Sequence, residues 1–370
     1  MLLAGRQASP WTPQAARNSL CVVSKRPPKP LGYAIIGCGR IFQNHLAGVR
    51  QCALARLVAV CDVDSSRRAA AASISGAPAA VADYRSVLER DDIDIVDICL
   101  PHYLHCRCVL DAADARKHIL CEKPIATNFA DALQMIERTE AQRICFGVVY
   151  QNRYNRASVK VRQALEAGRF GMVVAASCSM NNYKPQSYYQ DSWHGRRQSE
   201  GGGTLTTQAV HNLDLLCWFL GQPISVTAHV GVLTHHIEVE DTAAATIEFA
   251  NGAIAAFMST NSSFLPWSQR MEICGTLGNV VIEDNRITRW AFTDKMDLGD
   301  GFGREDADAL IPGSAGYGPS HPRIIADFVE SIHDGRSFLV NGREALKVSL
   351  LLWAIYRSAE SGRKETVDNL

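Results

Sequence analysis

The chain has 370 residues, of which 47% are hydrophobic and 21% are charged, and its 38 basic residues balance its 38 acidic residues. A net charge of zero gives no reason to expect a nucleic-acid partner or an anionic membrane surface. The sequence has no run of about 18 uncharged apolar residues, so we expect no transmembrane segment. The length predicts about two domains, each large enough to bury its own core.

The first 30 residues differ in composition from the rest. They contain arginine and lysine but no acidic residue, and they end in Pro-Pro-Lys-Pro. They lack the continuous apolar core and the small-residue cleavage site of a secretory signal. We expect residues 1–30 to be a disordered basic extension, with a targeting segment as the alternative.

The 12 cysteines do not follow a disulfide pattern. No Cys-x-x-Cys pair occurs, and Cys38, Cys61, Cys99, Cys121 and Cys145 lie within or beside apolar runs. Unpaired cysteine behaves as a small hydrophobic residue in such places. This usage predicts reduced thiols and a cytoplasmic protein.

Strand-like and helix-like segments alternate through residues 31–150. The expected strands are residues 33–36, 57–61, 95–100, 118–121 and 144–149. The first expected helix ends near residue 50, and the others cover residues 65–73, 84–90, 103–113 and 128–140. Such alternation predicts a parallel sheet with right-handed crossovers. We therefore interpret this α/β segment as a doubly wound, dinucleotide-binding Rossmann domain.

A glycine turn, Gly37-Cys38-Gly39, follows the first of these strands. Gly37 permits a tight turn, and Gly39 lets the backbone approach a pyrophosphate at the start of the next helix. Phe42 stands where the usual fingerprint has a third glycine, so helix and strand must separate or the ring must find space elsewhere. An ordinary strand–helix turn is the alternative for a bare Gly-x-Gly.

The second strand stops at Asp62, about 20 residues after the glycine turn. A carboxylate here would accept hydrogen bonds from the adenosine ribose and would repel a 2′-phosphate, which favours NAD over NADP. Arg67 and Arg68 follow closely, and one of them could bend back toward such a phosphate. NADP is therefore the alternative cofactor. Arg67 and Arg68 could also simply be solvent-exposed residues in the first turns of a helix, with no role in binding a phosphate.

The strand at residues 118–121 runs directly into Glu122-Lys123-Pro124. Proline favours extended backbone at the residue before it, so Lys123 is expected on a stiff bend. Ligands of open α/β sheets bind at the carboxyl ends of the strands, which is where this lysine stands.

Residues 151–370 predict a second domain of α+β type. Its expected strands are 172–182, 224–236, 241–250, 253–263, 269–276 and 278–290, and its expected helices include 321–335 and 342–361. Strands that follow one another without helices predict an antiparallel meander, and residues 292–320 predict a long loop. His235 and His236 would lie on one strand and point to opposite faces, so they are not a metal pair. We find no other metal-ligand spacing and predict no metal site.

A helix is predicted from about Thr204 to Leu220, directly after three glycines. Thr207, His211 and Asp214 stand at positions i, i+4 and i+7, which places them on one face of that helix. A single helical histidine can be a satisfied core residue, but the glycines would let the backbone pass close to a ligand here.

The combination of motifs resembles the glucose-fructose oxidoreductase/inositol dehydrogenase/rhizopine catabolism (Gfo/Idh/MocA) family over roughly residues 32–368. The motifs are Gly37-x-Gly39, Asp62, Leu100-Pro101-His102-x-x-His105, Glu122-Lys123-Pro124, Gly201-Gly202-Gly203-Thr204-Leu205 and His211-Asn212-Leu213-Asp214. The resemblance implies a Rossmann domain and a C-terminal domain with an open, mostly antiparallel sheet. It also implies a homodimer or homotetramer formed through that sheet, with the C-terminal helices able to pack back on the Rossmann domain.

The resemblance implies specific roles for these residues. Lys123 would be the general base or would orient the substrate hydroxyl, with His211 as its partner. Asp214 would orient His211, bond the backbone or contact a neighbouring subunit. Many relatives carry an acidic residue four positions before the histidine, where this chain has Thr207. The cofactor would be held by Gly37, Gly39, Arg40, Ile41, Asp62, Leu100, Pro101, His102, His105, Glu122 and Lys123, although His102 and His105 could instead cap the following helix.

Substrate contacts are expected from two segments. One is Gln151-Asn152-Arg153-Tyr154, and the other is the loop from Lys184 to Glu200, which includes Trp193. Aromatic rings suit the apolar face of a sugar, and arginines suit a carboxylate or phosphate. The alternative is a mobile surface loop with incidental aromatic residues. The predicted substrate-binding residues are Asn152, Arg153, Trp193, Thr207 and His211.

These features predict an NAD(P)-dependent oxidoreductase that moves a hydride between nicotinamide and a secondary alcohol of a sugar, sugar acid or cyclitol. The expected partner is therefore a small polyhydroxylated molecule. Two alternatives remain: an NAD-dependent glycosidase that uses transient oxidation, and a dinucleotide-binding regulator without turnover.

Overall fold

The computed structural model describes residues 29–190, 192–295 and 320–368. Nearly all of the predicted basic extension and most of the loop predicted for residues 292–320 lie outside the described residues. Within the described ranges, no helix is long and apolar enough to cross a membrane. The described cysteines are all free thiols, as predicted.

Six parallel strands form the first sheet, in the order β3-β2-β1-β4-β5-β6. They are β1 (Leu31–Ile36), β2 (Ala55–Cys61), β3 (Ala79–Val81), β4 (Ile95–Ile98), β5 (His118–Cys121) and β6 (Phe146–Val148). Strands β1 and β4 are almost fully buried, as expected for central strands covered by helices on both faces. The predicted doubly wound parallel sheet is confirmed. Successive strands are added on one side from β1 to β3 and on the other side from β4 to β6, so the strand order switches between β1 and β4.

The helices of this half lie close to where the sequence predicts them. They are α1 (Phe42–Gln51), α2 (Ser65–Ser75), α3 (Arg85–Leu88), the 3-10 turn η1 (His102–Leu104), α4 (His105–Asp114) and α5 (Phe129–Ala141). Asp64 caps α2 by accepting a hydrogen bond from the Arg67 amide at 2.8 Å. The Phe42 ring is buried in the core, so it has found space where a third glycine was expected.

The second sheet has eight strands in the order β13-β12-β11-β7-β10-β9-β8-β14. They are β7 (Val173–Asn181), β8 (Pro223–Gly231), β9 (Thr242–Phe249), β10 (Ile254–Thr260), β11 (Arg270–Gly275), β12 (Gly278–Glu283), β13 (Arg286–Phe292) and β14 (Glu365–Thr366). All pairs are antiparallel except β7 with β10. The mostly antiparallel sheet is confirmed, but it is not a simple meander, because β7 lies between β10 and β11.

Two of the predicted strands were wrong in extent. Residues 278–290 are not one strand but parts of β12 and β13, joined by a turn in which Asp284 and Asn285 both have positive φ. Strand β8 ends at Gly231, so His235 and His236 lie in the loop before β9 and not on a strand. The reason is Asp241, whose buried carboxylate accepts hydrogen bonds from the loop amides of Leu233, Thr234 and His235 and so bends the chain away from the sheet.

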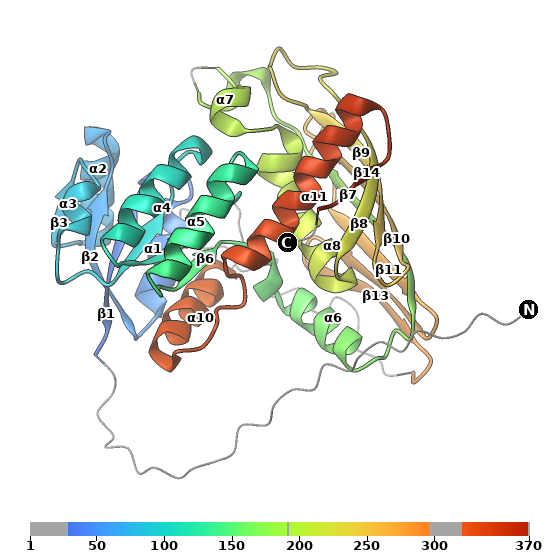
Figure 1. The fold of residues 1–370 in the computed structure, drawn as a ribbon, viewed down its shortest axis with the longest axis horizontal. Helices are drawn as coiled ribbons and strands as arrows, with labels where there is room; N and C mark the ends of the chain where they lie inside the picture. Colours follow the sequence, from blue (N-terminus) through green and yellow to red (C-terminus); the bar gives the residue numbers. More distant parts are fainter. Residues whose placement is uncertain (1–28, 191, 296–319, 369–370) are drawn as a thin grey trace, which may run out of the picture.

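The remaining helices cover the second sheet or join the two halves. They are η2 (Gln151–Tyr154), α6 (Arg156–Glu166), η3 (Gln186–Tyr188), α7 (Arg197–Glu200), a π-helical turn η4 (Leu205–Ala209), α8 (Val210–Leu220), α10 (Ser320–Asp334) and α11 (Gly342–Ser361). Helix α10 packs against α1, and α11 contacts α5 and β6 on one side and α8 and β8 on the other (Figure 1). The last part of the chain therefore ties both sheets together.

Candidate active site

A cavity of about 860 Å³ lies where the carboxyl ends of β1, β2, β4 and β5 meet segments of the second half. This position is the point at which the strand order of the first sheet switches, where ligands of doubly wound folds bind. Its wall includes the glycine turn, Asp62, Lys123, Thr207 and His211. Residues far apart in the sequence thus face one space.

The glycine turn has the shape that a dinucleotide requires. Gly37 has a φ of +103°, and a Cβ atom on it would lie 2.3 Å from the Cys99 carbonyl oxygen. Gly39 has open space where a Cβ would be, so its backbone is exposed to the cavity that Arg40 and Ile41 also line. Because α1 begins just after this turn, its free amides and dipole suit a diphosphate.

Asp62 both fixes the turn and faces the cavity. Its carboxylate accepts hydrogen bonds from the backbone amides of Cys38 at 2.8 Å and Asp64 at 2.9 Å. Arg68 is turned toward backbone, because its guanidinium donates to the Asp62 carbonyl at 2.7 Å, whereas Arg67 lines the cavity. These residues fit the adenosine side of NAD.

The segment after β4 reaches the cavity in part. Leu100, Pro101 and His102 line it, as the resemblance implies. His105 does not: its ring nitrogens lie 2.9 Å from the Leu100 carbonyl oxygen and 3.0 Å from that of Pro124, and the side chain is fully buried. His105 therefore ties two loops together and does not line the cavity.

Lys123 spans the two halves of the molecule. Its ammonium donates a hydrogen bond to the Thr207 carbonyl oxygen at 2.6 Å. Burial lowers the pKa of Lys123, and the charge of Lys184 lowers it further, while Glu122 and Glu200 oppose that change. A lysine in this setting releases its proton more easily than one in water.

Glu122 lies beneath Lys123 in a buried network that the sequence did not reveal. Its carboxylate lies 3.0 Å from His45 Nε2 and 3.9 Å from His321 Nε2, and His45 Nδ1 lies 2.7 Å from Asp97. Both nitrogens of His45 face carboxylate oxygens, so both must donate and the ring must be a cation. Burial opposes that charge, but Asp97 outweighs burial and raises the pKa of His45 well above its usual value.

The same contacts control Glu122. Burial would raise its pKa, but the hydrogen bond and charge of His45, with Lys123 and His321, lower it to about 2. The ligand atoms of His45, Glu122 and His321 lie within 4.8 Å of one another, close enough for a metal ion to bridge. The hydrogen bond between His45 and Glu122 already accounts for the shortest of these distances.

His211 lies in the first turn of α8 and lines the cavity. Its Nδ1 atom is buried and has no hydrogen-bond partner among the described residues. Burial lowers the pKa of His211 well below its usual value, and Lys123 adds to this effect, so the imidazole is neutral. Since Nδ1 is enclosed by protein, a ligand can meet only the part of the ring that lines the cavity.

Asp214 and Arg153 differ from their expected roles. Asp214 does not contact His211, because Arg153 binds its carboxylate through Nε at 3.0 Å and through Nη2 at 2.7 Å. Both side chains are buried, and neither lines the cavity. The cause is the packing of η2 against α8, which directs Arg153 into the helix interface, where Glu344 also meets it at 3.4 Å.

The other predicted substrate residues divide in the same way. Thr207 and Trp193 line the cavity, but Asn152 does not, and its neighbour Gln151 takes that place. Gln151 belongs to the expected segment, but no periodicity shows which of its residues faces the cavity, because the segment forms a single 3-10 turn.

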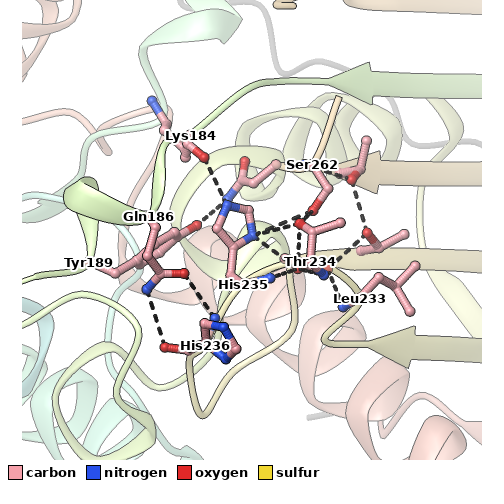
Figure 2. Close-up of polar contacts among 12 residues, drawn as sticks. Lys184, Gln186, Tyr189, Leu233, Thr234, His235, His236 and Ser262 are labelled. Atoms are coloured by element: carbon pink, nitrogen blue, oxygen red, sulfur yellow. Dashed lines mark hydrogen bonds and ion pairs between the residues drawn. The ribbon is translucent and has the colours of Figure 1, made fainter. Parts of the chain in front are cut away.

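The loop that starts at Lys184 is anchored by the segment before β9. His235 lies 2.8 Å from the Lys184 carbonyl oxygen and 3.0 Å from Asp241, and Gln186 exchanges hydrogen bonds with the backbone of His236 (Figure 2). These contacts fix Tyr188, whose ring lies under the charges of Arg40 and Lys184. The described part of this loop thus forms part of the cavity wall. This arrangement differs from the alternative expectation of a mobile surface loop with incidental aromatic residues.

Comparison with known proteins gives two family matches. Residues 31–150 match the model described as an oxidoreductase family with an NAD-binding Rossmann fold. Residues 158–281 match the model of the GFO/IDH/MocA C-terminal domain.

Individual relatives agree with these models over nearly the whole chain. Myo-inositol 2-dehydrogenase of Thermotoga maritima is 24% identical over 343 residues, covering 91% of this chain and 98% of its own. Inositol 2-dehydrogenase of Rhizobium meliloti is 27% identical over 345 residues, covering 90% and 98%. Among solved structures, the WlbA dehydrogenase of Bordetella pertussis, in complex with NADH and UDP-GlcNAcA, has a TM-score of 0.84 and 29% identity, covering 92% of this chain and 99% of its own.

Proposed function

The chain belongs to the Gfo/Idh/MocA family of NAD-binding oxidoreductases, and from this premise we propose that Lys123 and His211 act together on a secondary alcohol of a sugar, sugar acid or cyclitol. One observation carries the proposal. Lys123 follows β5 of the first sheet, His211 belongs to α8 of the second half, and both line one cavity.

Lys123 is proposed as the general base. Oxidation of an alcohol requires removal of the hydroxyl proton, and burial lowers the pKa of this lysine, which makes its neutral, proton-accepting form easier to reach. Its hydrogen bond to the Thr207 carbonyl holds the amine toward the helix that carries His211. In the direction of ketone reduction, the protonated form of Lys123 donates the proton to the substrate oxygen.

His211 is proposed as the partner that positions the hydroxyl group. The ring is neutral and lines the cavity, so it can exchange a hydrogen bond with a substrate hydroxyl there. Trp193 lines the same cavity and would offer an aromatic surface to the apolar side of a sugar.

NAD, when bound, supplies the hydride acceptor. Within this chain, Gly37, Gly39 and Arg40 would hold the diphosphate and Asp62 the adenosine ribose. The carboxylate of Asp62 supports NAD over NADP, because it would repel a 2′-phosphate.

The relatives suggest the substrates to test. Two are named for inositol, and the WlbA structure holds a nucleotide sugar acid. Purified protein should reduce NAD with at least one compound from a panel of inositols, neutral sugars and sugar acids. Lys123→Met should lower kcat/KM by about 10²–10⁴-fold while NAD binding by fluorescence titration is kept. Turnover of Lys123→Met within twofold of the unmodified protein would rule out the proposed base.

We also propose that the outer face of the second sheet joins two copies of the chain. Apolar side chains project from adjacent strands there, and Val174, Ile254 and Met258 are 42%, 52% and 42% exposed. Exposed apolar patches of this kind mark association surfaces, and the assembly would be a homodimer or homotetramer.

A further inference from the structure

Glu200 is a buried acid beside the site that no motif singled out. It ends α7, its side chain is about 2% exposed, and it does not line the cavity. Burying a carboxylate is costly unless hydrogen bonds compensate, so its partners indicate what it does.

The side chains that Glu200 contacts belong to the cavity wall. Thr207 Oγ1 donates to one carboxylate oxygen at 2.5 Å, and His194 Nδ1 lies 3.0 Å from the same oxygen. The other oxygen accepts the Gly195 amide. The backbone carbonyl of Glu200 meets His102 Nδ1 at 2.8 Å. One residue therefore holds three side chains that line the cavity.

The contact with Thr207 links Glu200 to Lys123. The Thr207 hydroxyl is bound by Glu200, and the carbonyl of the same residue receives the Lys123 ammonium. Thr207 lies within the π-helical turn that precedes α8, a local form that recurs at functional sites. The carboxylate thus fixes the group on which the ammonium rests.

We propose that Glu200 is a positioning residue for Lys123, acting through Thr207 and through its own negative charge. This inference rests on the proposed role of Lys123 as the base. Glu200 also orients His194, whose Nε2 lies 3.1 Å from the Tyr188 hydroxyl and whose ring stacks on Tyr188 at 4.5 Å.

The charges around Lys123 set the direction of the effect. Glu122 and Glu200 raise its pKa against burial, and Lys184 lowers it. The imidazoles of His102, His211 and His321 also face it, and Lys123 lowers the pKa of each. Removing the charge of Glu200 should therefore lower the pKa of Lys123 further.

The test titrates Lys123 directly in the full-length protein without substrate. Protein labelled with 13C at the lysine ε carbon is followed by NMR across neutral and alkaline pH, and Lys123→Met assigns the signal. In Glu200→Gln, the midpoint of Lys123 should fall by about one pH unit. In Glu238→Gln, which removes an exposed carboxylate that accepts the Arg197 amide at 3.0 Å, the midpoint should not move.

An unchanged or raised midpoint in Glu200→Gln would overturn the inference. If Glu200→Gln does not fold, Glu200→Asp should lower the midpoint of Lys123 by a smaller amount, because the shorter side chain draws the charge away from Thr207. An unchanged midpoint in Glu200→Asp would likewise overturn the inference. With an active substrate, the acidic limb of the pH profile of kcat/KM should shift to lower pH in Glu200→Gln, by the same amount as the titration midpoint of Lys123. Activity retained in Lys123→Met would instead count against the proposed function, which the titration does not measure.

Discussion

At the scale of single residues, the sequence identified the groups that touch the cavity better than the groups behind them. Lys123, Asp62 and His211 were predicted from turn chemistry, strand ends and helical spacing, and all three line the cavity. His45 was not predicted, because one histidine on the buried face of α1 cannot be told from a core residue by spacing. Asp214 was predicted to act with His211 because the two share a helix face. The sequence does not show that Arg153 binds Asp214 instead.

The buried cation His45 leads to a prediction about stability. Replacing it by Gln leaves Glu122 and Asp97 without their shared partner, which should cost about 3–5 kcal/mol in the free energy of unfolding at pH 7. The folded pKa of Glu122 is depressed to about 2, so its stabilising contribution exists above its unfolded value and is lost as pH falls from about 4.5 toward 2. The stability difference between the two proteins should therefore shrink at acidic pH.

Urea unfolding at pH 7 and at about pH 3 measures both effects, since the midpoint and slope give the free energy. His229→Gln is the matched control, because His229 is exposed on β8. A stability difference that stays constant across this pH range would show that His45 contributes packing and not charge.

At the scale of elements, regular segments were predictable and irregular ones were not. Helices α2 and α5 carry Asp64 and Asn128 as caps, and their limits follow those signals. The π-helical turn before α8 was invisible, because it is fixed by tertiary contacts with Glu240. That carboxylate accepts the amides of Gly203 at 2.9 Å and Leu205 at 3.0 Å.

The entry into α8 should therefore be sensitive to one added methyl group. A Cβ on Gly203 would lie 1.8 Å from the Glu240 carbonyl oxygen, so Gly203→Ala should lower stability by about 1–3 kcal/mol and displace Thr207 and His211. Thermal unfolding and kcat report the two effects. Gly39→Ala is the contrast: its Cβ meets nothing within 4 Å, so the melting temperature should stay and NAD affinity should fall. Equal loss of stability in both variants would contradict this account.

At the scale of the whole molecule, the two kinds of sheet were predictable but the strand order was not. Alternating strand and helix signals give a parallel sheet, and consecutive strands give an antiparallel one. The insertion of β7 between β10 and β11 and the addition of β14 beside β8 depend on contacts between distant segments. No local pattern encodes them.

The outer face of the second sheet leads to a prediction about assembly. Met258→Lys combined with Ile254→Lys places two charges in the proposed contact and should halve the assembled mass, from dimer to monomer or from tetramer to dimer, as measured by light scattering after size exclusion. Ala256→Lys, which lies between them on the same face of β10, would test whether a single charge suffices. An unchanged mass in the double variant would exclude this face as the interface.

Helix α11 and the segment before it also decide how the protein can be divided. The amide of Val148 in β6 donates to the carbonyl of Val340, and Ile325 of α10 occupies the place above Gly48 that a side chain would fill. A fragment cut after residue 150 would lose that edge partner and the cover of α1. The dinucleotide-binding half is therefore not a module that can be excised or grafted by itself, and a chimera with a relative would need to carry the C-terminal helices along with it.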